Sequence, residues 1–266
     1  MSILLLVVGF PSLVTPATSP GPFYSSPAKL VSVQAVNALE STNWAGYAIN
    51  APAGTVTQAK GSWIQPSVTC PSSGAYLAAF WAGIDGFINS PTVEQTGTIA
   101  QCVNGVATYY AWYEFYPAGS VEISSIVIKP GDVISATVKY SSTTGKFTTT
   151  IKDVTTGKSY TKSASVLGAL RSSAEWIEEA PSYCNLGCLY AMPNFGTASY
   201  GKDSTSVLHT NSAIISGSTK VISKFGSEVD SITMISSSSA TTIKATPSSL
   251  SSDGASFSVA FVSAGP

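Results

Sequence analysis

Apolar and polar side chains alternate through the middle of this chain, and turn sequences separate the alternating runs. In "VISATVKY" (133–140), every second residue from Ile134 to Tyr140 falls on one face of an extended strand. "KFTTTIKD" (146–153) repeats the pattern, and "KPGD" (129–132) is a strong turn sequence. Turns recur about every ten residues, and few windows have a helical period. The pattern predicts an all-β domain built as an antiparallel β-sandwich.

The two ends of the chain differ from this central part. "MSILLLVVGF" is too short to span a bilayer and resembles the apolar region of a secretory signal, although no basic residue precedes it. We expect residues 1–40 to be a signal-like segment with a propeptide or linker, including a short helix within 30–39. The folded domain is expected at 41–235. A Ser/Thr-rich extension that packs as late strands is expected at 236–266. These features predict a secreted protein whose mature form is not attached to a membrane.

Charged residues are scarce. They make up 10% of the chain, against about 25% in a typical soluble domain, and the formal net charge is −1. Nucleic acid and anionic membranes are therefore not expected as partners. Low charge fits an acidic setting, because few paired carboxylates can be lost to acid. It fits an ordinary Ser/Thr-rich extracellular domain equally well.

The sequence offers few groups for other kinds of chemistry. The single histidine, His209, has no serine-elbow motif around it, so we expect it to be structural or on the surface. Phosphate-binding, dinucleotide-binding and zinc motifs are absent, and we expect neither metal nor cofactor. Catalysis would then depend on carboxylates, amides and phenols.

Four cysteines fit an exported protein with disulfides. We expect Cys184 to pair with Cys188 across a small loop, and Cys70 to pair with Cys102. A metal site is the alternative, but the chain has neither a CxxC pair nor a histidine cluster.

Two segments combine an apolar strand face with a face that mixes aromatic and acidic side chains. Such a mixed face suggests a concave surface that contacts a ligand. The alternative is an amphipathic strand that carries a few surface aromatics. The mixed faces of "AAFWAGID" and "AWYEFYP" carry Trp81, Gly83, Asp85, Trp112, Glu114 and Tyr116.

The segment "AEWIEE" (174–179) places three glutamates beside a tryptophan. If it is a strand, Glu175 and Glu179 face one way and Glu178 faces the other. One glutamate can therefore point into a cleft while another lies outside it. Partial desolvation among aromatic side chains raises the pKa of a carboxyl group, which suits it to act as base and acid near an acidic pH.

These motifs, taken together and in order, resemble the glutamic peptidases, or eqolisins, a family of acid-acting endopeptidases first known from fungi. The likeness covers roughly residues 41–235. It implies a β-sandwich of two curved antiparallel sheets, similar to the concanavalin and legume-lectin architecture. The motifs that carry it are "NWAGY" (43–47), "WAGIDG" (81–86), "EQTG" (94–97), "AWYEFYP" (111–117) and "AEWIEE" (174–179).

The resemblance implies a catalytic pair, which by motif match is Gln95 and Glu175. The glutamate would activate a water, and the glutamine amide would stabilise the oxyanion that forms on the substrate carbonyl. Glu178 is a weaker candidate for the base. One departure is Glu94, where the family carries an apolar residue. We expect protein or peptide substrates and a monomer. The residues expected to line or support the cleft are Trp44, Trp81, Asp85, Glu114, Tyr116 and Glu178.

Two other functions remain open on the same fold. A lectin-like module would use the aromatic side chains to stack on sugars without catalysis. A glycoside hydrolase would pair Glu114 with Glu175, with the two carboxyl groups about 5–5.5 Å apart in a retaining enzyme. A peptidase instead requires Gln95 and a glutamate to approach each other with room for one water.

Overall fold

The computed structural model describes residues 23–35, 37–184, 188–237 and 242–265, with the side chains of 32–35 left out. The signal-like segment expected at the start of the chain lies outside the described residues. Within them the regular elements are almost all β-strands, which confirms the all-β antiparallel prediction. The elements are β1 (Leu30–Ala35), β2 (Ala38–Ser41), β3 (Trp44–Asn50), β4 (Val56–Ile64), β5 (Ala75–Ile84), β6 (Val93–Val103), β7 (Val106–Tyr116), β8 (Val121–Val127), β9 (Val133–Ser141), β10 (Lys146–Asp153), β11 (Ser159–Ala164), β12 (Ser173–Glu179), β13 (Thr197–Tyr200), α1 (Lys202–Thr205), β14 (Ser212–Ile215), β15 (Ser218–Val221), the 3₁₀ helix η1 (Ile222–Glu228), β16 (Val229–Ile235), β17 (Ile243–Pro247) and β18 (Phe257–Phe261).

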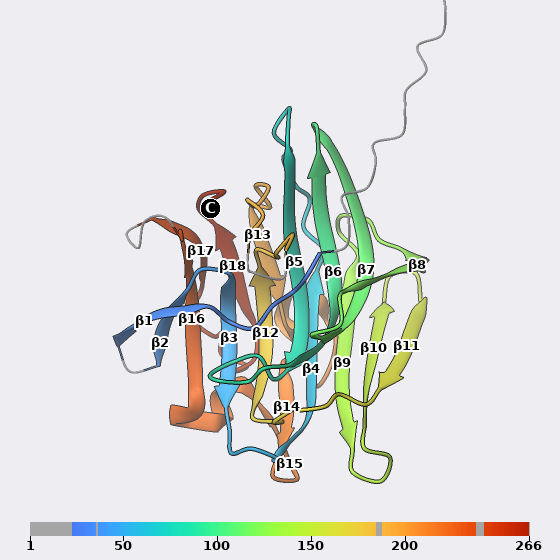
Figure 1. Cartoon of the computed structure of the whole chain (residues 1–266), viewed down its shortest axis with the longest axis vertical. Coiled ribbons are helices and arrows are strands. Elements are labelled where there is room, and N and C mark those ends of the chain that lie inside the picture. Colours follow the sequence, from blue (N-terminus) through green and yellow to red (C-terminus); the bar gives the residue numbers. More distant parts are fainter. Residues whose placement is uncertain (1–22, 36, 185–187, 238–241, 266) are drawn as a thin grey trace, which may run out of the picture.

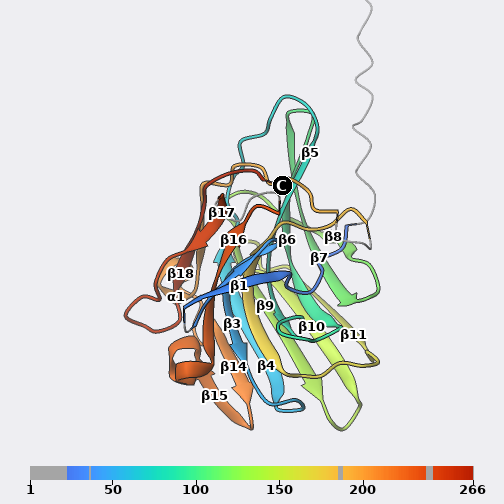
Figure 2. The same cartoon turned by 60° about the vertical axis from the view of Figure 1, so that its left-hand side comes forward.

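The strands form two layers that are joined along one edge (Figures 1 and 2). The front layer runs β2–β16–β3–β12–β5–β6–β7–β8, and every pair in it is antiparallel except β2–β16. The back layer contains the strands β11–β10–β9–β4 in this order. On its other edge, β4 pairs with β14 and with β13, and β13 is followed in the sheet by β18 and β17. Pairing of β16 with β17 connects the layers. Strands β17 and β18, from the segment expected to extend the domain, therefore belong to the sheet.

Apolar side chains cover both faces of the front layer. The main core lies between the layers and includes Trp63, Phe80 and Trp176. A second cluster covers the outer face of the front layer and includes Trp44 and Trp81. Because both faces are covered, β6 is buried over almost its whole length, which a strand with one solvated face would not be.

The N-terminal part of the described chain runs across that outer face. The helix expected within 30–39 is wrong: residues 30–35 form β1 and residues 38–41 form β2, because β2 pairs in parallel with β16 and β1 pairs with β2. Just before them, residues 23–28, which we call the strap, cross the front layer (Figure 1). Tyr24 and Ser182 exchange two backbone hydrogen bonds of 2.9 and 2.8 Å. The strap is thus added to the domain like a short extra strand.

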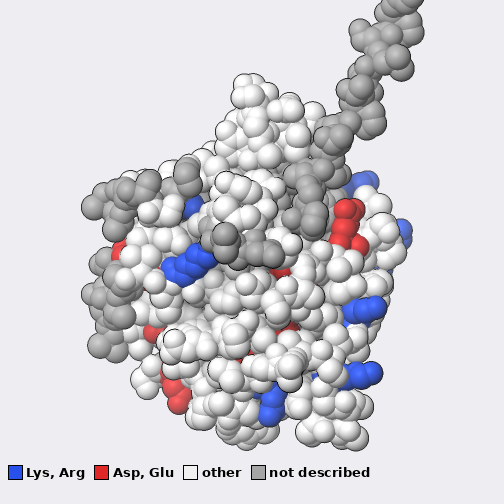
Figure 3. Space-filling model, viewed as in Figure 1, with Lys and Arg blue, Asp and Glu red and all other residues white. Residues whose placement is uncertain are grey.

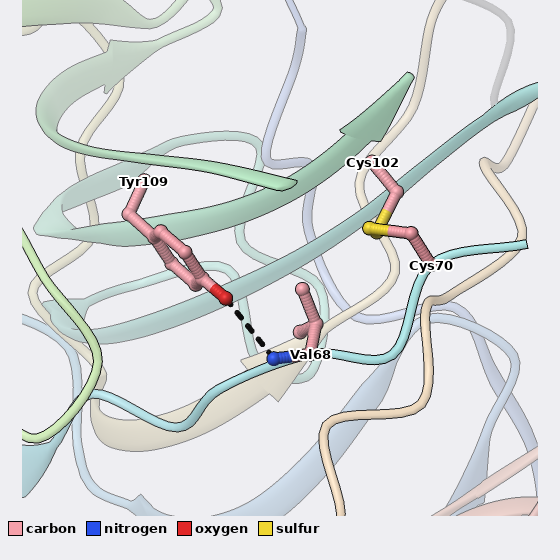
Figure 4. Close-up of a disulfide and its surroundings, with 4 residues drawn as sticks. All are labelled: Val68, Cys70, Cys102 and Tyr109. Atoms are coloured by element: carbon pink, nitrogen blue, oxygen red, sulfur yellow. Dashed lines mark hydrogen bonds between the residues drawn. A yellow bond between two sulfur atoms is a disulfide. The ribbon is translucent and has the colours of Figure 1, made fainter. Parts of the chain in front are cut away.

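Two disulfides link Cys70 to Cys102 and Cys184 to Cys188, each with a Cα–Cα distance of 5.4 Å. The first ties the loop after β4 to β6. In the same loop, the backbone N–H of Val68 donates to the Tyr109 hydroxyl at 3.1 Å (Figure 4). Among the described residues, no helix is long and apolar enough to cross a membrane, and no cluster of metal-ligating side chains is found.

Candidate active site

The register of four neighbouring strands builds a row of polar side chains on the outer face of the front layer. Gly83 on β5 lies opposite Glu175 on β12 and opposite Gln95 on β6. Gln95 in turn lies opposite Glu114 on β7. Directly opposite residues in antiparallel strands point to the same face, so this row places an amide among carboxyl groups. Glu179 lies four residues further along β12, on the same face.

Two glycines let the Trp81 side chain lie close to the sheet. A Cβ at Gly83 would lie 2.8 Å from the Trp81 ring, and a Cβ at Gly97 would lie 2.6 Å from the Trp81 Cβ. The indole edge contacts Trp44, with ring centroids 4.9 Å apart. In this position the indole Nε1 donates a hydrogen bond to Glu179 Oε2 at 2.9 Å. Trp81 therefore fixes the orientation of the Glu179 carboxyl group.

Gln95 is held between Glu114 and the strap. Its Nε2 donates to Glu114 Oε2 and to the backbone carbonyl of Ser25, both at 2.9 Å. Glu114 Oε2 also accepts the backbone N–H of Ser25 at 3.1 Å. Because Glu114 accepts from the amide nitrogen, the NH₂ group of Gln95, rather than its oxygen, is presented to a peptide carbonyl.

Glu179 completes the site from the other side of the strap. Its Oε1 accepts the backbone N–H of Ser26 at 3.0 Å, and its Oε2 accepts from Trp81 and from the Ser25 hydroxyl. The Ser25 hydroxyl also lies 3.3 Å from Gln95 Oε1. One peptide unit, from the Ser25 carbonyl to the Ser26 nitrogen, is therefore bonded by Gln95 at its carbonyl and by Glu179 at its nitrogen.

The carboxyl groups of the site are completely buried beneath the strap. Burial raises the pKa of Glu179 to about 8, while its hydrogen bonds to Ser25, Trp81 and Ser26 act in the opposite direction. Burial also raises the pKa of Glu114 well above its usual range, and the neighbouring charge of Glu179 adds to that effect. Covered by the strap, the two acids therefore favour their neutral forms.

The space-filling view shows how little charge surrounds this region. The face that carries the strap is mostly uncharged (Figure 3). The charge of Lys29 nevertheless acts on Glu179 and lowers its pKa, against the larger effect of burial.

The other glutamates predicted from the sequence as candidates for the base, Glu175 and Glu178, make no hydrogen bond to Gln95 or to the strap. Glu175 faces the outer side in the same row as Gln95, but neither of its carboxylate oxygens makes a hydrogen bond of normal geometry. Burial raises its pKa, the nearby Ser173 hydroxyl opposes this, and the charges of Asp85 and Glu94 raise it further. Glu178 points to the core between the layers, where burial raises its pKa and Lys244 lowers it.

Of the remaining predicted residues, some lie on the outer face of the front layer and Asp85 holds a neighbouring loop. Trp44, Trp112 and Tyr116 belong to the apolar cluster on the outer face. Asp85 lies just beyond β5 and accepts the backbone N–H groups of Arg171 and Ser172 at 2.7 and 2.8 Å. Asp85 therefore anchors the loop that leads into β12, and makes no hydrogen bond to Gln95 or Glu179.

Three residues of the site were not singled out from the sequence: Glu179, Ser25 and Ser26. The alternation of side chains in β12 places Glu179 on the same face as Glu175. The sequence therefore indicates that both can face the cleft, but it does not show which of them contacts Gln95 or the strap. Ser25 and Ser26 carry no motif and lie in a Pro- and Ser-rich stretch that is typical of a linker.

Comparison with known proteins identifies the family. The profile of the Peptidase A4 family matches residues 42–246. The chain belongs to this family. It is 33% identical over 181 residues to aspergillopepsin-2 of Aspergillus niger, a match that covers 60% of this chain and 62% of that protein. It is 38% identical over 157 residues to scytalidopepsin B of Scytalidium lignicola, covering 56% and 57%. The matches thus span about three fifths of each relative.

Solved structures agree with this assignment. A scytalido-glutamic peptidase with a transition state analog inhibitor superposes with a TM-score of 0.66 and 25% identity, covering 83% of this chain and 98% of that one. Aspergilloglutamic peptidase from Aspergillus niger superposes with a TM-score of 0.56 and 29% identity, covering 70% and 99%. The resemblance to glutamic peptidases seen in the sequence motifs is confirmed.

Proposed function

We propose that this Peptidase A4 member is a secreted endopeptidase that hydrolyses peptide bonds in acid with Gln95 and Glu179 as its catalytic pair. The observation that carries the proposal is the peptide unit held between these two side chains. Gln95 donates to its carbonyl oxygen, and Glu179 accepts from its N–H group. A peptide substrate that replaces the strap would meet the same two groups at the bond to be cut.

The reaction follows from this geometry. Ionised Glu179 takes a proton from a water, which adds to the carbonyl carbon of the substrate. The NH₂ group of Gln95 stabilises the oxyanion, a contribution typically worth about 3–4 kcal/mol. Glu179, now protonated, lies beside the amide nitrogen and returns the proton to it as the carbon–nitrogen bond breaks. The residues need neither metal nor cofactor for this sequence of steps.

We assign Glu114 a positioning role. It holds the Gln95 amide nitrogen at 2.9 Å and so keeps the donor directed at the substrate carbonyl. In the glycoside hydrolase alternative, Glu114 would instead react together with Glu175. The hydrogen bonds favour the peptidase, because Glu114 bonds to Gln95 while Glu175 bonds to neither. The assignment of the base to Glu175 stays a prediction, and it is tested against Glu179 below.

Acidic conditions suit both members of the pair. The amide of Gln95 stays neutral and keeps donating where an imidazole would be charged. Removal of the strap exposes Glu179 to water, so its pKa should fall toward the ordinary glutamate value of about 4.3. The two disulfides fit a protein made for an oxidising, extracellular setting.

The test is cleavage of a denatured protein at about pH 4, close to the reference pKa of glutamate. The Gln95→Ala variant is compared with Gln101→Ala. Gln101 lies on the same face of β6 and contacts the Tyr110 hydroxyl at 3.2 Å. Loss of an oxyanion donor should lower the rate about 10²–10³-fold in Gln95→Ala, and Gln101→Ala should stay close to the wild-type chain. Pepstatin, which targets paired aspartates, should not inhibit. Full activity in Gln95→Ala would refute the proposal.

A further inference from the structure

The charged groups of the chain are divided unequally between its interior and its surface. Nine of the fourteen acidic residues are buried, whereas twelve of the thirteen basic residues are not, the exception being Lys244. Lys and Arg side chains line the right-hand side of Figure 3, where β10 and β11 lie in Figure 1. The formal net charge of −1 therefore does not describe the surface, on which basic groups outnumber acidic ones.

Four of these basic residues lie on the outer face of the back layer. The register places Lys152 opposite Ser135, Lys139 opposite Thr148 and Lys146 opposite Ser141. On the other edge of β9, Lys60 of β4 lies opposite Thr137. Alternate residues of a strand are about 7 Å apart, so each of four successive rows across β9 carries one lysine. We call this surface, made by the outward side chains of β9, β10 and β11 together with Lys60, the basic face.

The strands of the basic face carry almost no acidic residues. In β4, β9, β10 and β11 the one carboxyl group is that of Asp153, which is buried and accepts the backbone N–H of Thr156 at 3.2 Å. Lys60 Nζ donates to the carbonyl of Leu208 at 3.0 Å, a neutral partner that leaves its charge in place. Burial lowers the pKa of Lys60, and the neighbouring charge of Lys139 lowers it further. The lysines thus repel one another and would be stabilised by an anion that spans several rows.

Hydroxyl groups fill the positions between the lysines. From Ser135 to Ser141, from Lys146 to Lys152 and along β11, the outward residues are Ser, Thr and Lys alone. Thr148 Oγ1 lies 2.8 Å from Ser163 Oγ, and the hydroxyls of Thr150 and Thr161 lie 3.0 Å apart.

Each of these hydroxyl pairs can both donate to a ligand and accept from it. The bond within a pair uses one of its two protons, so one proton and several lone pairs remain. Neighbouring strands are about 4.8 Å apart, so the ammonium and hydroxyl groups form a regular and nearly flat array.

We propose that the basic face binds an acidic polysaccharide, a polymer of sugar units that carry carboxylate groups. The carboxylates would pair with the lysines, and the sugar hydroxyls would exchange hydrogen bonds with the Ser and Thr side chains. The basic face and the row that contains Gln95 lie on opposite sides of the two layers. The inference is therefore independent of the proposed function, and a chain bound in this way would keep its cleft free.

Other anionic partners need groups that the basic face does not offer. Single-stranded nucleic acids stack their bases on aromatic side chains, and phosphates are bound in bidentate fashion by arginine. Anionic membranes take up apolar side chains as well as pairing with basic ones. Acidic proteins are bound chiefly through Trp, Tyr and Arg. Because the outward residues of β9–β11 within the ranges above are Ser, Thr and Lys, the polysaccharide fits best.

The experiment measures binding of the full chain to polygalacturonate by isothermal titration calorimetry in low salt at about pH 5, where carboxyl groups are ionised. Fully methyl-esterified polygalacturonate keeps the sugar hydroxyls without the charges and serves as the matched ligand. We expect clear binding to the acid form and little to the ester. Binding should weaken as salt is added, and it should weaken again at about pH 2.5, where carboxyl groups are protonated.

A charge variant locates the site. The triple change Lys139→Gln, Lys146→Gln and Lys152→Gln alters exposed side chains and leaves the core intact, so the chain should fold. Exposed ion pairs are weak singly, so the loss of three should raise Kd for polygalacturonate between about threefold and a hundredfold. Cleavage of a peptide, measured in the same samples, should not change.

A matched control removes the same charge from other exposed positions, on α1, β15 and η1. It should bind polygalacturonate nearly as well as the wild-type chain. The control changes are Lys202→Gln, Lys220→Gln and Lys224→Gln.

A hydroxyl variant separates a polysaccharide from other polyanions. Thr148→Val with Thr150→Val removes two hydroxyls, keeps the β-branched shape and leaves the charge unchanged. This chain should bind polygalacturonate more weakly, by about fivefold if one hydrogen bond of typical strength is lost. Its binding to polyglutamate, which has carboxylates but no hydroxyls, should stay the same.

Each outcome decides the proposal. Absence of binding, equal binding of the methyl ester, or an equal loss in both lysine variants would overturn it. Tighter binding to an oligothymidine strand or to phosphatidylserine vesicles, or an unchanged Kd in the hydroxyl variant, would overturn the choice of ligand. A chain that binds polygalacturonate as expected but cleaves no peptide would support this proposal and refute only the proposed function.

Discussion

The buried glutamates should make the protein less stable as the pH rises. Burial raises the pKa of each, so the folded chain keeps protons that the unfolded chain has already lost above its reference pKa of about 4.3. The unfolded state then binds fewer protons than the folded state. Under that condition the free energy of unfolding falls with increasing pH. The completely buried glutamates are Glu94, Glu114, Glu175, Glu178 and Glu179.

The size of the effect follows from the number of groups that stay neutral. Each such carboxyl group lowers the free energy of unfolding by about 1.4 kcal/mol per pH unit, or about 3 kcal/mol between pH 5 and 7. Glu179 alone, with a pKa of about 8, spans that window. The pKa values of Glu94, Glu114, Glu175 and Glu178 are raised in the same direction, so each of these groups adds to the loss. We therefore expect the free energy of unfolding to fall by at least about 3 kcal/mol between pH 5 and 7.

Lys244 has the opposite sign but acts at a different pH. Burial lowers its pKa from 10.5 to about 8, so the folded chain loses this proton before the unfolded chain does. Stability gained in this way appears only as the pH rises above about 8. It does not offset the loss expected between pH 5 and 7.

Urea unfolding followed by circular dichroism at pH 5, 6 and 7 measures the effect. The Gln95→Ala chain serves as the parent, so that cleavage does not interfere. Adding Glu175→Gln removes one group whose pKa is raised and should make the slope shallower, by at most about 1.4 kcal/mol per pH unit. Stability that is constant or rises over this range would refute the reasoning, as would an unchanged slope in the Glu175→Gln chain.

Two further predictions concern the substrate and the disulfides. Substrate peptides with phenylalanine two positions before the residue whose carbonyl is attacked should be preferred, because this phenylalanine would take the place of Phe23. Burial of its ring is worth about 2 kcal/mol, so a peptide with alanine at this position should have a KM roughly thirtyfold higher. Equal KM values would contradict this placement of the cleft. Removing the Cys70–Cys102 disulfide, with its sequence separation of 32, should lower the free energy of unfolding by about 4 kcal/mol, against about 2 kcal/mol for the Cys184–Cys188 bond with its separation of 4. The reverse order in urea unfolding would show that loop length does not set their contributions.

The alternation of side chains along the strands predicted the all-β fold and the face of the sheet on which the candidate site residues lie. Alternation placed Glu175 and Glu179 on one side of β12 and Glu178 on the other, as the register shows. It also placed Trp81 and Glu114 on the cleft face. Period two is a local property, so it can be read without knowing which strands are neighbours.

The hydrogen bonds on which the proposal of Glu179 rests could not be predicted in the same way, and the assignment of the base to Glu175 stays a prediction. These bonds depend on the Trp81 indole, which reaches Glu179 because Gly83 and Gly97 leave room for it, and on the strap, which comes from another part of the chain. The helix expected at 30–39 failed for a related reason. Pairing of β2 with β16 joins residues about 190 positions apart, and such long-range contacts override weak local preferences.

The most direct test of the catalytic pair compares Glu179→Gln with Glu175→Gln, two identical changes on the same face of one strand. Both chains are assayed for kcat/KM on one peptide at about pH 4, where an unperturbed glutamate is partly ionised. If Glu179 is the base, its variant should lose at least about 10³-fold, while the Glu175 variant should stay within about tenfold of the wild-type chain. A Glu179→Gln chain that remains active while Glu175→Gln is inactive would contradict the assignment.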